Sequence, residues 1–332
     1  MGVRAPAVVF AAPNVVEVRT VELPDLGPRD VRIRTVCSGV SQGTERWLLT
    51  DRYRWAGGIP QYPHFPGYQA AGVVEEVGGE VDDLRPGDHV FAQGTRFADP
   101  DARYGLGSHT GSLVQAREDV TPLESGVDLA AASLLRMAGV SRHGVRLTGV
   151  EPGDLVVVIG QGMIGQMSAQ AARRRGARVI ATDVIEARVR ASAASSADRV
   201  VDASVEDLAD VVREEAPDGA DVVIDTTGLG AMLETCVELV RREGRICLQG
   251  YYPDPIRVEF HPTHLKRATV TFPCWVDREH DAELAADLAA GRVAIEPLIT
   301  HRIPYTDAVV AFELVVHHPE RSLGMVLTWS EE

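Results

Sequence analysis

The pattern of apolar and polar positions divides the chain into two parts near residue 150. Residues 1 to about 125 hold short runs in which apolar and polar residues alternate, such as VRIRTVCSGV, and Gly and Pro separate these runs. Alternation at every second position is typical of half-buried strands, and Pro-Gly pairs are typical of the turns between them. The first part of the chain therefore predicts a small β-rich barrel.

From about residue 150, continuous apolar runs alternate with helical patterns. DLVVVIG is typical of a buried strand, and MIGQMSAQAARRRG, which ends at Gly176, is typical of the helix after it. The alternation continues with the strands RVIATD, DRVVD, ADVVIDTTG and RICLQG, and with the helices EARVRASAASS, SVEDLADVVREEA and MLETCVELVRREG between them. This order predicts a parallel, doubly wound sheet.

The end of the chain shows neither pattern. A helix, REHDAELAADLAAG, is followed by LITHRIPYTDAVVAFELVVHH and by a final strand, GMVLTW. Because this segment has no parallel-sheet rhythm of its own, we expect it to return to the first domain. The predicted fold class is α/β, and the predicted domains are residues 1–125 with 274–332, and residues 126–273.

Composition narrows the class of protein. The chain has 332 residues, 45% of them apolar, and a formal net charge of −15. This length allows about two domains, each with its own core, in an ordinary α/β protein. Nucleic acid is a disfavoured partner because phosphate binding requires a basic surface.

The sequence predicts neither export nor a membrane span. The apolar run before Pro13 is too short for a signal peptide, and no run approaches the roughly 20 residues of a membrane-spanning helix. The cysteines are scattered and form no C-x-x-C pair, which argues against a zinc ribbon or a disulfide framework. They are Cys37, Cys236, Cys247 and Cys274. We expect a soluble, cytoplasmic protein.

A glycine pattern follows the first predicted strand of the second domain. Gly160, Gly162 and Gly165 form G-x-G-x-x-G in VVVIGQGMIGQ, between a strand and the start of a helix. Gly160 allows a tight turn, Gly162 lets backbone N–H groups approach a pyrophosphate, and Gly165 lets the helix pack on the strand. The pattern in this context predicts a dinucleotide site. The alternative is a glycine-rich turn without a ligand.

Asp183, at the end of the next predicted strand, indicates which cofactor binds. A carboxylate there accepts hydrogen bonds from the adenosine ribose hydroxyls and repels a 2′-phosphate, so NAD(H) is favoured over NADP(H). Two alternatives remain open: Asp183 forms only a turn, or the nearby Arg188 tolerates a phosphate. The predicted cofactor-binding residues are Gly160, Gly162, Met163, Ile164, Gly165, Asp183, Arg188 and Gly250.

The order of motifs along the chain resembles a known superfamily. PGYQAAGVVEEVG, LRPGDHVFA, GSLVQ, GVEPGDLVVVIGQGMIGQ and DVVIDTTG follow one another as in the medium-chain dehydrogenase/reductase (alcohol dehydrogenase-like) superfamily. The resemblance covers nearly the whole chain and implies a GroES-like catalytic domain interrupted by a Rossmann NAD(H)-binding domain. Within the superfamily, SGVSQGTER and the terminal PLITHR and MVLTW are similar to the group that contains the bacteriochlorophyllide a 3-hydroxyethyl dehydrogenase.

The same resemblance implies that the zinc sites of the superfamily are missing. The positions that correspond to its catalytic zinc ligands hold Ser41, Tyr68, Gln69 and Arg136. A hydroxyl, a phenol, an amide and a fixed cation do not hold Zn²⁺, which requires thiolate, imidazole or carboxylate donors. The segment FAQGTRFADPDARYGLGSHTGS, where the structural zinc lobe is expected, contains no Cys. We therefore expect no metal and zinc-independent catalysis.

Without zinc, hydrogen-bond donors have to stabilise and protonate the oxygen at the reacting carbon. Tyr68 stands where a metal ligand would face the substrate, Thr44 matches the hydroxyl relay position of the superfamily, and Ser41 stands at a lost ligand position. These three are the candidate catalytic residues. Each also has a structural interpretation: Tyr68 packs against the barrel, Thr44 caps a turn, and Ser41 fills vacated space.

Further residues carry weaker functional hypotheses. Glu45 is expected to pair with an Arg, and Arg136 either binds a substrate carboxylate or carbonyl or forms a buried ion pair. His109 and His143 are candidate proton shuttles, although lone histidines are commonly structural. The segment RWLLTDRYRWAGGIPQYPH is either a surface loop or a wall of the substrate cleft. The aromatic residues that would form this wall are Trp47, Tyr53 and Trp55.

The leading functional prediction is a zinc-independent, NAD(H)-dependent oxidoreductase that acts on a small-molecule secondary alcohol or ketone. The first alternative is an enoyl or quinone reductase that uses NAD(P)H, since zinc-free members of the superfamily commonly reduce C=C bonds. The second is a nucleotide-binding protein without catalysis. The segment ATVTFPCW is expected to pair across a twofold axis, which predicts a homodimer.

Overall fold

The protein, here a computed structural model, is described over residues 3–54, 61–99, 102, 104–274 and 280–330. Trp55, a predicted wall residue, lies outside these ranges. The chain divides into two compact units, a first unit of residues 1–136 with 277–332 and a second unit of residues 137–276. Each unit is built around sheets of its own.

The first unit is rich in strands, as the alternating pattern predicts. Its larger sheet has the order β14–β15–β3–β4–β5–β7 with β6 also paired to β3, and β1 and β2 form an antiparallel pair. Its strands are β1 (Arg4–Ala12), β2 (Val15–Glu22), β3 (Asp30–Gly39), β4 (Ala70–Val77), β5 (His89–Ala92), β6 (Ser112–Ala116), β7 (Val120–Pro122), β14 (Ile299–Pro304) and β15 (Gly324–Thr328). Its helices are α1 (Gln42–Leu49), α2 (Leu129–Ala132), α9 (Asp281–Ala289) and α10 (Ala308–His317), and α3 (Leu135–Leu147) begins in it.

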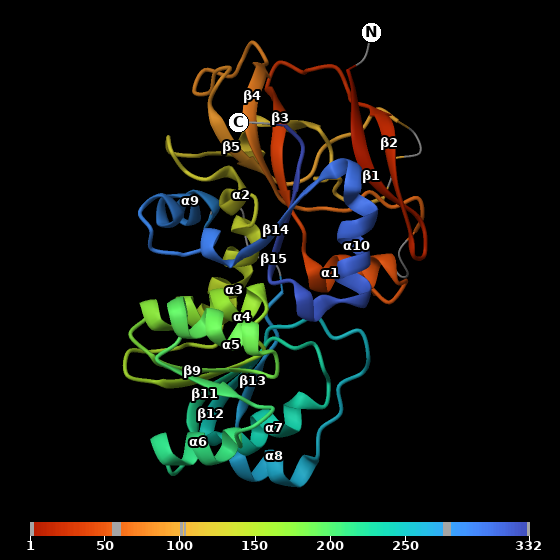
Figure 1. Ribbon diagram of the computed structural model, residues 1–332. Coiled ribbons are helices and arrows are strands. Elements are labelled where there is room, and N and C mark those ends of the chain that lie inside the picture. Colours follow the sequence, from red (N-terminus) through yellow and green to blue (C-terminus); the bar gives the residue numbers. More distant parts are fainter. Residues whose placement is uncertain (1–2, 55–60, 100–101, 103, 275–279, 331–332) are drawn as a thin grey trace. The chain divides into compact units, whose positions relative to one another are not determined.

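The closing segment of the chain packs into this unit (Figure 1). β15 pairs antiparallel with β3 and parallel with β14, and α10 lies beside β1. The ring of Phe312 in α10 packs edge-on against Phe10 of β1, with centroids 4.9 Å apart. The side chains that α10 buries are spaced three and four residues apart, which places them on one helix face. They are Ala308, Ala311, Phe312 and Val315.

The second unit is a six-stranded parallel sheet of order β10–β9–β8–β11–β12–β13. This order confirms the predicted doubly wound sheet. The strands are β8 (Leu155–Ile159), β9 (Arg178–Asp183), β10 (Arg199–Asp202), β11 (Ala220–Asp225), β12 (Val240–Leu248) and β13 (Thr269–Thr271). The helices are α4 (Met163–Arg174), α5 (Glu186–Ser195), α6 (Leu208–Glu215), α7 (Met232–Leu239) and α8 (Phe260–Lys266).

Alternate residues of β8 pack on opposite faces of this sheet, and helices lie on both sides (Figure 1). Val157 and Ile159 belong to a core that includes residues of α6 and α7. Val156 and Val158 belong to a second core with residues of α3 and α4. Because both faces are covered, the strand is apolar throughout, which explains the continuous run in the sequence. None of the helices in the described residues is long and apolar enough to span a bilayer.

One predicted helix is too long. The pattern predicts a helix through MLETCVELVRREG, but α7 ends at Leu239 and β12 begins at Val240. Val240 is fully buried and pairs with Ala220 of β11, so burial in the sheet overrides the helical pattern of the charged residues that follow. Glu243 then takes a φ of +60°, at which no helix continues.

Candidate functional site

The glycine pattern forms a tight turn between β8 and α4 in the second unit. Gly160 has a φ of +83°, a conformation that favours glycine. A Cβ added to Gly165 would lie 1.9 Å from the carbonyl oxygen of Gly160, so only glycine lets α4 approach the turn this closely. A Cβ on Gly162 would meet no atom of the described residues within 4 Å. The turn is therefore close-packed at Gly160 and Gly165 and open at Gly162, as a backbone that approaches a ligand requires.

The other predicted cofactor residues lie near this turn. Met163 and Ile164 form the start of α4, where backbone N–H groups are available to an anion. Gly250 follows β12, and a Cβ there would clash with the loop after β11. Sequence reasoning missed Thr226, whose hydroxyl donates to the carbonyl oxygen of Gly160 at 2.8 Å. The signal was available, because DTTG places a hydroxyl residue at the end of a neighbouring parallel strand.

Asp183 ends β9 and holds the glycine turn from the side. One carboxylate oxygen accepts a hydrogen bond from the backbone N–H of Gln161 at 2.7 Å, and the other accepts from the backbone N–H of Ile185 at 2.9 Å. The guanidinium of Arg188 lies 3.7 Å from the first oxygen. The structure thus brings Asp183 and Arg188 together at the turn. Of the alternatives that the sequence left open for Asp183, its role in forming the turn is the one that the hydrogen bonds show.

In the first unit, a buried chain of polar side chains begins where β3 leads into α1. Glu45 accepts a hydrogen bond from the backbone N–H of Ser41 at 3.1 Å, and its other oxygen lies 2.9 Å from Nε2 of His109. Nδ1 of His109 lies 2.7 Å from the Ser38 hydroxyl, to which Nε1 of Trp329 donates at 2.8 Å. Segments far apart in the sequence therefore meet in one hydrogen-bonded chain.

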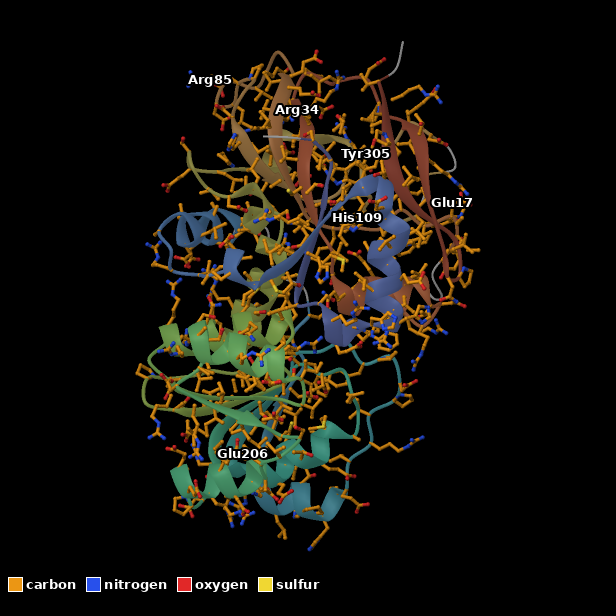
Figure 2. All side chains as sticks on the ribbon, in the orientation of Figure 1. Glu17, Arg34, Arg85, His109, Glu206 and Tyr305 are labelled. Carbon is orange, nitrogen blue, oxygen red and sulfur yellow. The ribbon has the colours of Figure 1, made fainter. Side chains whose placement is uncertain are left out.

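The donors and acceptors of this chain can all be paired. The Ser38 hydroxyl can donate to Nδ1 of His109 while it accepts from Nε1 of Trp329. In that tautomer, Nε2 of His109 donates to Glu45, which also accepts from the backbone N–H of Ser41. Figure 2 shows His109 in the interior of the first unit, where its side chain and that of Glu45 are fully buried.

The expected pairing of Glu45 with an Arg is wrong, because its partner is His109. Both side chains are completely enclosed, so each depends on the other as a hydrogen-bond partner. Sequence reasoning treated His109 as a lone histidine. No local pattern joins residues 45 and 109, which meet only because the fold brings the segment before β6 against the start of α1.

Tyr68 precedes β4, and its phenol lies within hydrogen-bonding reach of the Ser41 hydroxyl. Burial raises the pKa of Tyr68, and the negative charge of Glu45 raises it further, against the opposing effects of Ser41 and Arg136. The phenol therefore keeps its proton at neutral pH. The structure brings Tyr68 and Ser41 together and connects them, through Glu45, to His109.

Thr44, the third candidate catalytic residue, lies on a different face of α1. It precedes Glu45 by one position, which turns its side chain by about 100° around the helix. Thr44 shares its face with Trp47, three residues later. The guanidinium carbons of Arg46 and Arg52 lie 5.0 and 4.6 Å from the centre of the Trp47 ring system. The three predicted catalytic residues are therefore not all in one place. Tyr68 and Ser41 lie together, and Thr44 lies on a different face of α1.

Arg136, at the start of α3, forms a buried ion pair. Its side chain lies 3.3 Å from a carboxylate oxygen of Asp281 in α9, and both residues are less than 5% exposed. Gln93 donates to the same oxygen at 2.9 Å. Of the two interpretations of Arg136, the ion pair is the one present in the structure.

These side chains do not suit zinc. Ser41, Tyr68, Gln69 and Arg136 offer a hydroxyl, a phenol, an amide and a cation, whereas zinc takes thiolate, imidazole or carboxylate donors. The amide nitrogen of Gln69 is directed at the backbone oxygen of Gly39, 3.5 Å away. Within the part of the chain that the structure describes, no group of three or more His, Cys, Asp or Glu is placed to hold a metal ion.

Comparisons with known proteins define the family. Residues 27–129 match the family of alcohol dehydrogenase GroES-like domains, and residues 164–291 match the family of zinc-binding dehydrogenases. Together the two matches cover well over half of the chain. The chain belongs to the medium-chain alcohol dehydrogenase-like family of NAD(P)-dependent oxidoreductases. The predicted combination of a GroES-like and a Rossmann fold is confirmed.

Individual relatives extend this result. The chain is 28% identical over 331 residues to the 2-desacetyl-2-hydroxyethyl bacteriochlorophyllide A dehydrogenase of Cereibacter sphaeroides, with 98% of each chain covered. The fold of this chain matches that of a zinc-binding dehydrogenase of Sinorhizobium meliloti 1021 bound to NADP, with a TM-score of 0.83, 21% identity and 98% and 99% of the two chains covered. It also matches a short chain alcohol dehydrogenase of Escherichia coli CFT073 complexed with NADH, with a TM-score of 0.84, 19% identity and 98% and 100% covered.

Proposed function

We propose that the protein is a zinc-independent, NAD(H)-dependent oxidoreductase that interconverts a secondary alcohol and a ketone. The observation that carries this proposal is the position of Tyr68, whose phenol lies beside the Ser41 hydroxyl and near the Glu45 carboxylate that holds the backbone of Ser41. A protonated phenol can stabilise and protonate a developing alkoxide, which is the task that zinc performs as a Lewis acid in metal-dependent enzymes.

In ketone reduction, Tyr68 donates a hydrogen bond to the substrate oxygen and transfers its proton as negative charge develops there. Ser41 donates a hydrogen bond to the resulting phenolate, and a proton from solvent restores the phenol before the next turnover. Glu45 takes no proton in this scheme; it holds the backbone of Ser41 in place. Alcohol oxidation uses the same groups in the reverse order. When bound, NAD(H) would supply or accept the hydride.

The preference for NAD(H) is supported by the turn after β8. Gly160, Gly162, Gly165 and the start of α4 are suited to a pyrophosphate. Each Asp183 oxygen accepts one backbone N–H, which leaves lone pairs for ribose hydroxyls, and the carboxylate repels a 2′-phosphate. Arg188 offsets part of this repulsion. We therefore infer a preference for NAD(H) that is moderate in size.

The test of this function is a screen of NAD⁺ reduction across sugars, cyclitols, hydroxyethyl aromatics and simple alcohols. We expect turnover with at least one class and none that depends on added zinc. Tight NADH binding without any turnover would favour a non-catalytic nucleotide-binding protein instead.

Metal dependence is tested on the purified protein. Activity is expected to survive exhaustive chelation, and metal analysis is expected to find no stoichiometric zinc. Loss of activity that added zinc restores would contradict the proposal, and so would tightly bound zinc.

We also propose a homodimer in the cytoplasm. β13 stands at the end of the sheet order of the second unit, and Phe272, which follows it, is 63% exposed. Pairing of this edge with a second copy would satisfy its backbone groups. The free cysteines fit a reducing compartment. A light-scattering mass near 35.8 kDa at micromolar concentration would contradict the dimer.

A further inference from the structure

A buried network of amide and hydroxyl side chains joins the glycine turn, α4 and α5. Gln161 lies in the turn and Gln166 in α4, whereas Ser192 lies in α5 and Ser196 follows one helical turn later. All four residues are fully buried. Because a buried polar group depends on protein partners, such a network is stable only when its donors and acceptors are paired.

Every polar side-chain atom of this network has a partner. Ser196 donates to the amide oxygen of Gln166 at 2.7 Å, and the amide nitrogen of Gln166 donates to the Ser192 hydroxyl at 2.8 Å. The Ser192 hydroxyl in turn can donate to the amide oxygen of Gln161, 2.9 Å away. The amide nitrogen of Gln161 donates to the backbone oxygen of Val158 in β8, at 2.9 Å. The hydrogen bonds therefore continue from α5 to β8 without a gap.

The network fixes two residues beside the Asp183 carboxylate. The backbone N–H of Gln161 donates to Oδ2 of Asp183 at 2.7 Å, so the side-chain bonds of Gln161 also hold a donor to Asp183. The amide nitrogen of Gln166 donates to the backbone oxygen of Arg188 at 3.1 Å, and the Arg188 guanidinium lies 3.7 Å from the same carboxylate oxygen. The direction in which Asp183 presents its lone pairs therefore depends on the network.

We propose that Gln166 and Ser192 are positioning residues for the selectivity between NAD(H) and NADP(H). By fixing Gln161 and Arg188, the network keeps the Asp183 carboxylate directed at the ribose hydroxyls and prevents it from turning toward the guanidinium. This inference rests on the proposed function, because it deepens the cofactor preference assigned to Asp183.

Ser192→Ala tests the centre of the network. It removes the hydroxyl that joins Gln166 to Gln161 and leaves the side chain of Asp183 unaltered. NADH affinity, measured by calorimetry, should fall by a factor of about three to ten, which corresponds to one hydrogen bond. NADPH gains less from Asp183, whose carboxylate repels the 2′-phosphate, so its affinity should fall less. The preference for NADH should therefore narrow.

Ser196→Ala is the matched control. Ser196 is as fully buried as Ser192, and its hydroxyl donates to the amide oxygen of Gln166. In this variant the amide nitrogen of Gln166 keeps its acceptors, Ser192 and the backbone of Arg188. The melting temperature should fall as in Ser192→Ala, because both variants leave a buried amide with one partner fewer. The ratio of NADH to NADPH affinity should stay unchanged.

Gln161→Met provides the same test if Ser192→Ala does not fold. Methionine has about the length of glutamine, and the backbone N–H of residue 161 can still donate to Asp183. The side chain, however, is no longer held by Ser192 and Val158. The preference for NADH should narrow in this variant too.

The comparison of serine variants decides the inference. An unchanged cofactor ratio in Ser192→Ala would overturn it, whatever happens to the melting temperature. An equal change of the ratio in Ser196→Ala would also overturn it, because general loosening of the unit would then explain both results. Either result leaves the proposed cofactor preference in place when the unaltered protein binds NADH more tightly.

The unaltered protein tests that preference separately. Equal or better affinity for NADPH would contradict the proposed preference for NAD(H). A ratio that then still changes in Ser192→Ala, and not in Ser196→Ala, would support the positioning role of the network by itself.

Discussion

The glycine turn between β8 and α4, which we call the cofactor turn, and the cluster around Tyr68, which we call the Tyr68 site, are assembled in different ways. The turn lies within one strand–turn–helix–strand stretch, and its main contacts depend on side chains that are absent, at Gly160 and Gly165. The Tyr68 site instead takes one or two polar side chains from each of several separate segments. These side chains belong to Ser38, Ser41, Glu45, Tyr68, His109 and Trp329. A local pattern encodes the first site, whereas the packing of a whole unit creates the second.

This difference has an energetic side. At the glycine turn, the first backbone N–H groups of α4 have no partner within the helix and are available to a ligand. The side chains of Ser38, His109 and Glu45 are fully buried, so each of these polar groups depends on its protein partner. Removing one partner from such a chain leaves the next one unsatisfied, which costs about 1–3 kcal/mol. Substitutions at the turn should therefore affect mainly binding, and those in the buried chain should affect folding as well.

The largest effect is expected from Tyr68→Phe. Removing a positioned proton donor lowers turnover by a factor of roughly 10²–10⁴, and the ring that remains preserves packing. NADH affinity, measured by calorimetry, should stay unchanged because the cofactor turn lies in the other unit. Tyr104→Phe, which removes an exposed phenol from the same unit, is the control and should retain activity. Near-normal turnover in Tyr68→Phe would eliminate Tyr68 as the proton donor.

Thr44→Val tests whether Thr44 contributes to catalysis as much as Tyr68 does. Thr44 lies on a different face of α1 from Glu45, so we expect turnover to fall less than in Tyr68→Phe. The measurement is kcat at saturating substrate for both variants. A larger loss in Thr44→Val would make its hydroxyl, and not the phenol, the first proton carrier.

Two glycines of one motif should respond differently to the same added methyl group. In Gly165→Ala the new Cβ meets the carbonyl oxygen of Gly160, so both the melting temperature and NADH affinity should fall. In Gly162→Ala the methyl points into space free of protein, so NADH affinity should fall about tenfold or more with little change in melting temperature. Unchanged NADH affinity in Gly162→Ala would show that no ligand approaches this backbone.

The sequence predicted the turn well and the Tyr68 site only in part. A strand, three spaced glycines and an acidic residue at the next strand end all lie between Leu155 and Asp183, and in the structure Asp183 holds the glycine turn by a hydrogen bond. Ser41 and Tyr68 were chosen because the family resemblance aligns them with zinc-ligand positions, and their catalytic role stays a prediction. The contact between Glu45 and His109 was not predicted, because it depends on tertiary packing between segments that share no local pattern. The predicted end of the helix after Met232 was wrong for the same reason, because burial of Val240 in the sheet ends α7 at Leu239.

Glu45→Gln tests the electrostatic part of the Tyr68 site. The amide oxygen can still accept from Ser41 or His109, but the negative charge that raises the pKa of Tyr68 is removed. Ketone reduction needs the protonated phenol, so its rate falls as pH rises through the pKa of Tyr68. In Glu45→Gln this alkaline limb of the kcat profile should therefore move to lower pH.

A merely structural role for Glu45 predicts a different result, in which kcat or melting temperature falls and the alkaline limb stays in place. The raised pKa of Tyr68 also bears on stability. Above about pH 10 the unfolded phenol ionises while the folded one keeps its proton, so the free energy of unfolding should decrease as pH rises.

The smallest effect is expected at Asp183. Replacement by Ser removes the charge that repels a 2′-phosphate and that offsets the positive charge of Arg188, which lies 3.7 Å from Asp183 in the unaltered protein. Asp183→Ser should therefore narrow the difference between NADH and NADPH affinity, by about tenfold, and weaken NADH binding through loss of an acceptor for the ribose. Because Asp183 also accepts from the backbone of Gln161 and Ile185, the variant should melt at a lower temperature. Calorimetric titration of both cofactors decides the case, and equal or better NADPH affinity in the unaltered protein would show that Asp183 serves the turn alone.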